Sequence, residues 1–278
     1  MKKISRRSFL AAAGLSVAAL ALTACGGSAS SVASSVASSA SSAAASTSAA
    51  AGELTTVEAG KLTMATNAAF PPYEMTTDAG EFEGIDIETA QAIADKLGLE
   101  LQIDDMDFDA ALLSVQQGKA DIVMAGVTVT DERKAVMDFS DSYATGIQSI
   151  IVPEGSDIAS PDDLAGKKIG TQRGTTGYIY CSDDFGDDNV VAYDDGLTAV
   201  QALNNGQVDA VVIDNAPAQE FIAANPGLKI LDTSYAEEDY AIGMAKGSSL
   251  EDAVNAALKE LKADGTLQSI VDKYITAE

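Results

Sequence analysis

Histidine is absent from this sequence of 278 residues, and cysteine occurs only twice. Without histidine the chain cannot form Ser-His-Asp or Cys-His catalytic arrangements, and most zinc sites are disfavoured. Since one of the two cysteines, Cys25, lies near the start of the chain, the remaining sequence offers Cys181 no partner for a disulfide. We therefore expect Cys181 to be a buried, unreactive thiol.

Basic residues are also scarce. The chain has 17 Lys and Arg against 42 Asp and Glu, which gives a formal net charge of −25 at pH 7. Such an acidic protein is repelled by phosphate backbones and anionic lipid surfaces, so nucleic acid is not expected as a partner. The excess of acid mainly confers solubility. It does not fix the charge of a ligand, because a pocket can differ from the surface around it.

The first 25 residues have the pattern of an export signal. Lys2, Lys3, Arg6 and Arg7 are followed by small and apolar residues at 8–24, a run too short for a typical membrane span. The segment LTAC at 22–25 resembles a lipoprotein signal-peptidase site. We predict that residues 1–24 are removed, with an uncleaved membrane anchor as the alternative. Residues 5–10 also resemble a twin-arginine export motif.

Cys25 would then be the first residue of the mature chain and carry the lipid. Attached acyl chains such as palmitate would hold the protein at the outer side of the cell membrane. Residues 26–52 consist only of Gly, Ser, Ala, Val and Thr, a composition typical of a flexible linker that buries no core. The sequence therefore predicts a lipidated linker over residues 25–53 and an extracytoplasmic location.

Strand and helix patterns alternate from residue 54 onwards. We predict strands at 61–66, 99–103 and 121–125, and helices at 86–97 and 108–117, from the spacing of their apolar residues. Alternation of this kind indicates an α/β fold, in which right-handed crossovers join the strands of a parallel sheet.

Part of this pattern occurs twice. Residues 113–123 and 200–212 both contain a helix end, a glycine, two further residues, an aspartate and a buried strand. The glycine suits the left-handed conformation that ends many helices. With another first strand near 167–171, the repeat predicts a second α/β lobe. A chance likeness between two common helix-to-strand joints is the alternative.

The end of the chain is expected to return to the first lobe. A strand at 240–244 is followed by amphipathic helices at 249–263 and 267–274, which find nothing left to cover in the second lobe. We predict one lobe from residues 54–144 plus 239–278 and another from residues 145–238. The chain would cross between them twice and form a hinge.

The third predicted strand ends at a candidate binding site. Gly126 and Thr128 follow the strand, and Thr130 is placed to cap a helix that contains Arg133. Open α/β sheets bind small ligands at the carboxyl ends of their strands. The planar guanidinium of Arg133 matches a carboxylate, so we expect a small carboxylate ligand. The alternative is that residues 131–134 are a solvated first helical turn.

Other strand ends should reach the same cleft. Phe70, Tyr73 and Phe108 follow the first two strands, where they either stack on a ligand or pack in the core. In the second lobe, residues 171–177 form a Gly/Thr-rich turn that opens a helix, which is a pattern typical of an anion site. A phosphate-binding loop would need a GK[ST] ending, which is missing. Asp214 ends a further strand.

Taken together, the runs ATNAAFPPYE, GIDIETAQAIADKLG, MDFDAALLSVQQGKADIVMAGVTVTDER, MDFSDSY, GKKIGTQRGTT, GQVDAVVIDN and DGTLQSIVDKY cover nearly the whole mature domain. In these runs the chain resembles the extracellular solute-binding proteins of polar amino acid ABC transporters (solute-binding family 3). The resemblance implies a two-lobed, periplasmic-binding-protein-like fold of type II with two hinge crossings. It also implies a receptor that closes on a free L-amino acid and delivers it to the membrane subunits of an ABC permease.

The resemblance also assigns roles to residues. It implies that Arg133 binds the ligand α-carboxylate with help from the backbone N–H groups of Thr128, Thr175 and Thr176. The α-ammonium would be held by the carbonyl of Gly126, the hydroxyl of Thr128 and the carboxylate of Asp214. The full predicted site is Asn67, Phe70, Phe108, Gly126, Thr128, Arg133, Gln172, Thr175, Thr176 and Asp214.

One departure from the family pattern bears on the ligand. Asn67 stands where members that bind Lys, Arg, His or Gln often have Asp, which favours a polar ligand with an uncharged side chain. Charge could instead come from Glu74, Asp105 or Asp107. We expect no cofactor and no catalysis. The alternatives are a sensor that binds without transport and a prephenate- or arogenate-type dehydratase, for which Glu74 is the candidate acid.

Overall fold

The computed structural model describes residues 54–275. The predicted signal at 1–24, the linker at 25–53 and the lipidation site Cys25 therefore lie outside the described residues. Between residues 54 and 275, no helix has the length and apolar character needed to cross a membrane.

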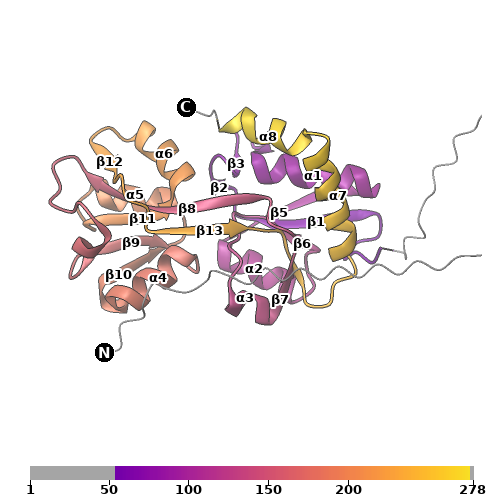
Figure 1. Ribbon diagram of the computed structural model, residues 1–278, viewed down its shortest axis with the longest axis horizontal. Coiled ribbons are helices and arrows are strands. Elements are labelled where there is room, and N and C mark those ends of the chain that lie inside the picture. The colour runs from indigo at the N-terminus through magenta and orange to yellow at the C-terminus, as the bar shows by residue number, and fades with distance from the viewer. Residues whose placement is uncertain (1–53, 276–278) are drawn as a thin grey trace, which may run out of the picture. The chain divides into compact units, whose positions relative to one another are not determined.

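The first sheet has the strand order β5-β1-β6-β14-β7. Its strands are β1 (Lys61–Thr66), β5 (Glu100–Asp105), β6 (Ile122–Val123), β7 (Met137–Phe139) and β14 (Gly243–Ala245). Strand β1 pairs in parallel with β5 and β6, whereas β14 is antiparallel to its neighbours. The helices of this part are α1 (Ile85–Leu97), α2 (Phe108–Gln116), α3 (Asp131–Val136), α7 (Glu251–Ala263) and α8 (Thr266–Tyr274). The last two pack on α1 (Figure 1).

The second sheet has the order β10-β9-β11-β8-β12, with β13 paired to β8. Its strands are β8 (Ala144–Pro153), β9 (Ile169–Gln172), β10 (Val190–Tyr193), β11 (Ala210–Asp214), β12 (Leu228–Ile230) and β13 (Ala236–Tyr240). Its helices are α4 (Thr176–Phe185), α5 (Gly196–Asn204) and α6 (Asn215–Ala224), with short 3-10 helices η1 (Pro161–Leu164) and η2 (Asp187–Asn189). A small sheet of β2 (Ala69–Phe70), β3 (Glu74–Thr76) and β4 (Phe82–Glu83) lies beside the first.

Two strands join the lobes. β8 and β13 run side by side between the two sheets in antiparallel register, from Ala144 opposite Tyr240 to Gln148 opposite Ala236 (Figure 1). The predicted two lobes and two crossings are therefore present, while the lobe bounds proposed from the sequence remain a prediction. Gly146 permits this close pairing, since a Cβ at that position would lie 2.4 Å from the Tyr240 ring.

Apolar side chains from the strands and helices fill each lobe. Leu62 and Met64 of β1 pack with Ile93 of α1 in the first lobe, and all three side chains are fully buried. In the second lobe Ile150 and Ile169 pack around Cys181. Burial raises the pKa of the Cys181 thiol to about 12, so the thiolate that reacts is disfavoured at neutral pH. This agrees with the expectation of a buried, unreactive thiol.

The repeated helix-to-strand joint has the same geometry in both lobes. Gly118 and Gly206 follow their helices with φ of 66° and 67°, which favours glycine in each case. In the first lobe the Asp121 carboxylate accepts hydrogen bonds from the backbone N–H groups of Val57 and Thr63, at 2.7 and 2.8 Å. In the second, Asp209 accepts one from the N–H of Lys168 at 2.7 Å. In each lobe the aspartate just before β6 or β11 thus binds the backbone near the start of the neighbouring strand, β1 or β9.

Strand boundaries differ from the predictions in two places. The strand expected at 121–125 forms ladder pairs only at Ile122–Val123, because the chain then bends toward the Gly126 turn. The strand expected at 240–244 is two strands, β13 and β14. β13 carries three acidic residues and shows no apolar period in the sequence. It is a strand because it pairs with β8.

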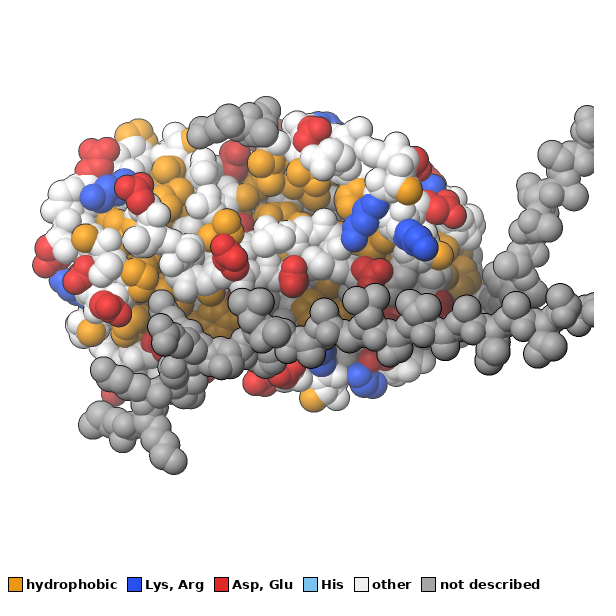
Figure 2. Space-filling model, viewed as in Figure 1, with side chains coloured by type: hydrophobic (Ala, Val, Ile, Leu, Met, Phe, Trp, Pro, Cys, Tyr) orange, Lys and Arg blue, Asp and Glu red, His pale blue; other side chains and the backbone are white. Residues whose placement is uncertain are grey.

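Acidic side chains are scattered over the face seen in Figure 2, with fewer basic ones between them. This distribution agrees with the excess of Asp and Glu in the composition.

Candidate functional site

A cavity lies where the strand ends of the two lobes meet. The space between its walls, which includes some open solvent, is about 430 Å³. All ten residues predicted from the sequence line it: Asn67, Phe70, Phe108, Gly126, Thr128, Arg133, Gln172, Thr175, Thr176 and Asp214. The wall is completed by Glu74, Ala125, Gln148, Val212, Ile213 and Tyr240.

Arg133 is the one basic residue in this wall among the residues described. Thr130 caps helix α3 by accepting a hydrogen bond from the Arg133 N–H at 3.2 Å, as predicted. The side chain is 8 % exposed, whereas its neighbours Glu132 and Lys134 are exposed. The alternative of a solvated helical turn therefore holds for those neighbours and not for Arg133.

The Arg133 guanidinium contacts both lobes. Nη1 donates to the Thr128 carbonyl at 2.7 Å, and Nη2 donates to the Gly174 carbonyl at 3.1 Å. Its Cζ lies 5.4 Å from the centre of the Phe108 ring, within the range of a cation–π contact. Burial lowers the Arg133 pKa, opposed mainly by the negative charge of Glu238. An arginine nevertheless stays protonated. The wall thus holds a cation whose hydrogen-bond partners are neutral carbonyls.

Asp214 supplies an anion from the second lobe. It ends β11 and caps α6, where Oδ1 accepts from the Ala216 N–H at 3.1 Å and Oδ2 accepts from the Ile147 N–H at 2.7 Å. The side chain is 2 % exposed. Burial raises its pKa to about 6, against the lowering effect of these N–H groups. A positive group placed in the cavity would offset that cost of burial.

Thr128 lies at the junction of both lobes and the crossing strands. Its hydroxyl donates to Oε2 of Glu238 at 3.0 Å and lies 3.3 Å from the hydroxyl of Thr176. The same Glu238 oxygen accepts from Nε2 of Gln148 at 3.0 Å. Glu238 is 6 % exposed and was missed by the sequence reasoning, because only the pairing of β13 with β8 turns it inward. Glu238 lies behind the cavity wall and holds two of the wall residues, Thr128 and Gln148, in place.

Asn67 directly follows β1, Gln172 is the last residue of β9, and the two side chains contact each other. Nε2 of Gln172 donates to Oδ1 of Asn67 at 2.8 Å, and Nδ2 of Asn67 donates to the Met106 carbonyl at 3.0 Å. Asn67 is therefore engaged on both sides of its amide. Its position joins the lobes at the edge of the cavity.

The Gly/Thr-rich turn opens helix α4, as predicted. Thr175 is the cap and accepts from the Tyr178 N–H at 3.3 Å, while its own hydroxyl donates to the Gln172 carbonyl at 2.8 Å. Its backbone N–H points to the same carbonyl at 3.4 Å. Thr176 is 2 % exposed and is the first residue of the helix. The positive end of α4 therefore faces the cavity.

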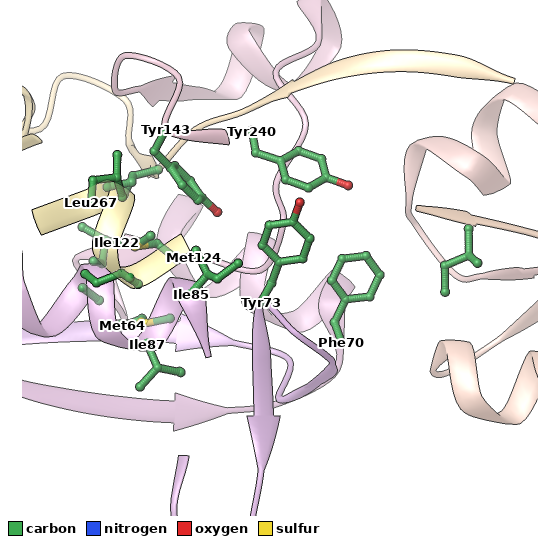
Figure 3. Packing of buried hydrophobic residues seen from close by; sticks show 14 of the residues in the cluster. Met64, Phe70, Tyr73, Ile85, Ile87, Ile122, Met124, Tyr143, Tyr240 and Leu267 are labelled. Atoms are coloured by element: carbon green, nitrogen blue, oxygen red, sulfur yellow. The ribbon is translucent and has the colours of Figure 1, made fainter. Parts of the chain in front are cut away.

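The rings of Phe70, Tyr73 and Tyr240 lie close together (Figure 3). Phe70 stacks on Tyr73 at 5.9 Å between ring centres, and Tyr73 meets Tyr240 edge-on at 5.4 Å. Phe70 and Tyr240 line the cavity, whereas Tyr73 is 3 % exposed and packs behind them. Gly126 has a φ of 55°, and a Cβ there would lie 2.9 Å from the Phe70 ring. The strand-end glycine is thus needed for the aromatic wall.

The three acidic residues considered as sources of charge occupy different places. Glu74 lines the cavity. Asp105 accepts a hydrogen bond from the Ala68 N–H at 2.8 Å and is not part of the wall. Asp107 lines a separate depression beside Arg173. Within residues 54–275 no group of His, Cys, Asp and Glu side chains is arranged to hold a metal ion.

Known proteins are similar to this chain in sequence and in fold. A sequence model of the bacterial extracellular solute-binding proteins, family 3, matches residues 62–277. A probable histidine-binding protein of Neisseria gonorrhoeae is 32% identical over 275 residues, which cover 96% of this chain and 95% of that protein. The L-cystine-binding protein of Escherichia coli is 33% identical over 226 residues, with 80% and 85% covered.

A solved structure has the same fold as this chain. The arginine-, lysine-, histidine-binding protein ArtJ of Geobacillus stearothermophilus superposes with a TM-score of 0.75 at 34% identity, covering 78% of this chain and 96% of that one. The predicted two-lobed fold of the periplasmic binding proteins is therefore confirmed. The chain belongs to the bacterial extracellular solute-binding proteins, family 3.

Proposed function

We propose that the protein is an amino-acid receptor that closes on its ligand and delivers it to an ABC importer. One observation carries the proposal: a buried guanidinium, Arg133, and a buried carboxylate, Asp214, line the same small cavity from different lobes. A free amino acid has one carboxylate and one ammonium group, so it matches both charges at once. The names of the relatives, which bind histidine, cystine or arginine, support this ligand class.

In this proposal Arg133 binds the α-carboxylate, helped by N–H groups of Thr128 and of the turn at Thr175 and Thr176. Planar guanidinium and carboxylate groups form paired, charge-assisted hydrogen bonds, and the start of α4 adds a positive dipole. Asp214 binds the α-ammonium together with the Gly126 carbonyl and the Thr128 hydroxyl. Phe70 and Phe108 enclose the ligand side chain.

The site also defines how the ligand would close the protein. The contacts Arg133 to Gly174, Thr128 to Thr176 and Asn67 to Gln172 all join the proposed lobes. A ligand shifts a conformational equilibrium only through contacts that differ between the two states. Because Asp214 and the α4 turn come from the second lobe, a ligand held by Arg133 gains them on closure. We propose that a membrane permease recognises this closed form.

The proposal includes the location of the protein. The export signal, cleavage before Cys25 and lipidation at Cys25 would place the receptor outside the cytoplasm on a lipid anchor, with residues 26–53 as its linker. This part is tested separately, by mass spectrometry of the membrane-bound protein. A lipid adduct on Cys25 is expected, and a Cys25→Ala variant should lose both the adduct and the membrane association.

Ligand binding is tested by a thermal-shift screen. The twenty amino acids, cystine, ornithine and citrulline would be added to purified protein. A ligand present at 100 times its dissociation constant stabilises the folded state by ~2.7 kcal/mol, which such a screen detects. The Arg133→Ala variant should lose the shift, whereas Lys134→Ala, which removes an exposed charge from the same helix, should keep it. Turnover of prephenate or arogenate would instead favour the dehydratase.

A further inference from the structure

Glu238 is a buried carboxyl group on the crossing strand β13, and its hydrogen bonds reach the cavity wall. The side chain is 6 % exposed. Its Oε2 accepts from the Thr128 hydroxyl and from Nε2 of Gln148, both at 3.0 Å. Its Oε1 has no hydrogen-bond partner among the residues described. Thr128 and Gln148 line the cavity whereas Glu238 does not, so Glu238 can act on a ligand through these two side chains.

Backbone pairing sets the position of the Glu238 carboxylate. On the ribbon formed by β8 and β13, Glu238 lies opposite Gly146, and Gln148 lies opposite Ala236. Side chains two residues apart on a strand point to the same face, so Glu238 and Gln148 are diagonal neighbours on one face of the ribbon. The acceptor is therefore fixed by the strands that join the lobes.

The hydroxyl of Thr128 has a single proton, and this proton points to Glu238. A threonine hydroxyl donates one hydrogen bond and has two lone pairs that accept. The hydroxyls of Thr128 and Thr176 lie 3.3 Å apart, and either atom is close enough to be the donor. Because the Thr128 proton is already directed at Glu238, the donor in this contact must be Thr176. The order of donation is thus Thr176 to Thr128 to Glu238.

This order decides what the Thr128 oxygen offers to a ligand. Of its two lone pairs one accepts from Thr176, which leaves one acceptor position and no proton for a group in the cavity. Gly126 and Asp214 line the same cavity, and their carbonyl and carboxylate oxygens are acceptors as well. A ligand group placed among these three oxygens must donate. An ammonium group donates through each of its protons, a hydroxyl donates once and an oxo group does not donate.

We propose that Glu238 is a positioning residue that makes the site selective for the α-ammonium group, because it fixes the Thr128 hydroxyl as an acceptor. This inference rests on the proposed function, and it concerns how an amino acid is distinguished from its 2-hydroxy and 2-oxo analogues. Without an acceptor at Glu238, the Thr128 proton would be free to turn toward the cavity, where it repels an ammonium group and favours a ligand oxygen. Glu238 thus adds to the selection made by Asp214 without contacting the ligand.

The test is isothermal titration calorimetry of the full chain with L-arginine, L-histidine and L-glutamine, each compared with the 2-hydroxy acid that has the same side chain. The readout is the dissociation constant of the hydroxy acid divided by that of the amino acid, for each pair that binds. Glu238→Met keeps the length of the side chain but removes the acceptor. It should lower this ratio about tenfold, as expected for the loss of one hydrogen bond to a charged group.

Two further variants separate the acceptor from other properties of the strand. Glu238→Gln removes the negative charge but keeps an acceptor oxygen, so the ratio should stay within about threefold of its original value. Glu237→Met removes an exposed carboxylate from the same strand and is the matched control. It should leave the ratio unchanged.

Variants of the two threonines locate the proton independently and decide the question if Glu238→Met does not fold. Thr128→Val removes the hydroxyl and should also lower the ratio about tenfold. Thr176→Val removes the donor at the other end and should keep the ratio, because Thr128 still donates to Glu238. A fall in Thr176→Val as large as that in Thr128→Val would mean that the Thr128 proton points to Thr176, which would overturn the inference.

The outcomes separate this inference from the proposed function. An unchanged ratio in folded Glu238→Met protein would overturn the inference. Equal weakening of amino acid and hydroxy acid would do the same, since that is the effect of a purely structural residue. The amino-acid receptor would stand in each of these cases. Failure of every amino acid of the thermal-shift screen to bind the unaltered protein would overturn both.

Discussion

The two lobes share a folding pattern but equip the cavity differently. Both contain the helix, glycine, aspartate and strand of the repeated joint, and both have an amide side chain at the end of β1 or β9: Asn67 just after β1 and Gln172 as the last residue of β9. The first lobe contributes large side chains, including the guanidinium of Arg133 and the ring of Phe70. The second contributes the start of α4 and the helix-capping carboxylate of Asp214. The two lobes therefore share the helix-to-strand joint and differ in the residues that their strand ends place in the cavity wall.

This difference predicts that the lobes do not contribute equally to binding. Arg133→Ala should weaken ligand binding by about 2–5 kcal/mol, since a buried carboxylate would lose its charged partner. Asp214→Asn should weaken it too, but the first lobe alone should still hold the ligand weakly. Isothermal titration with the ligand found by thermal shift measures both. Equal losses in both variants would contradict a division in which the first lobe holds the ligand and the second closes on it.

The second-lobe carboxylate should also impose a pH dependence on the stability of the unliganded protein. The folded pKa of Asp214 is about 6 against an ordinary value of 3.8, so the folded state retains a proton that the unfolded chain has lost. The contribution of this proton to the free energy of unfolding is therefore complete below pH 4. It falls as the pH rises toward 6, by at most about 1.4 kcal/mol per pH unit. Urea denaturation across this range measures it. The fall should be smaller in Asp214→Asn and unchanged in the exposed control Asp183→Asn. A fall of the same size in Asp214→Asn would assign it to other groups, such as Asp86 in the first lobe.

The aspartates of the repeated joint, Asp121 and Asp209, lie outside the cavity wall, so the two lobes can be compared there for folding stability without an effect on the wall. Asp121 is 6 % exposed and holds two backbone N–H groups, whereas Asp209 is exposed and holds one. Asp121→Ala should cost about 1–3 kcal/mol of unfolding free energy, because buried donors are left unsatisfied. Asp209→Ala should cost less, since water can replace its acceptor. Chemical denaturation compares the two, and a larger loss at Asp209 would contradict the role of burial.

The smallest expected effect concerns Gly174, beside Asp109 of the other lobe. Gly174 has a φ of 73°, and a Cβ there would lie 1.6 Å from Oδ1 of Asp109 on α2. Gly174→Ala should lower ligand affinity by about 1 kcal/mol, since a non-glycine residue is strained at this φ and the carboxylate must move on closure. Gly186→Ala is the matched control, with a φ of 84° and open space around it. It should lose similar stability and no affinity. Asp109→Ala should restore affinity to the Gly174 variant.

The sequence predicted the features that depend on short segments. Helix α1 ends at Gly98 in the left-handed conformation, α3 begins after the Thr130 cap, and the α4 turn begins at Thr175. Each rests on local backbone chemistry, which residue types reveal. Together with the resemblance to a known family, these features placed all ten predicted residues in one cavity.

Features that depend on pairing between distant segments escaped prediction. Glu238 looks like a solvent-exposed acid in its sequence, and it is buried because β13 aligns with β8 and turns it toward Thr128 and Gln148. Tyr240 enters the cavity wall for the same reason. Glu74 was considered as a source of charge, but its sequence does not reveal that both of its oxygens are buried without a hydrogen-bond partner among the residues described. No local pattern encodes such neighbours.

The paired crossing strands determine how such a molecule can move. β8 and β13 are bonded to each other over five residue pairs, and Gly146 lets the Tyr240 ring lie directly against the backbone of its partner. If the protein opens and closes as proposed, two strands paired in this way would bend together and keep the backbone hydrogen bonds between them. Even a methyl group at position 146 would wedge the ribbon apart. A side chain at position 146 should therefore disturb the connection between the lobes while leaving the residues of the cavity wall unchanged.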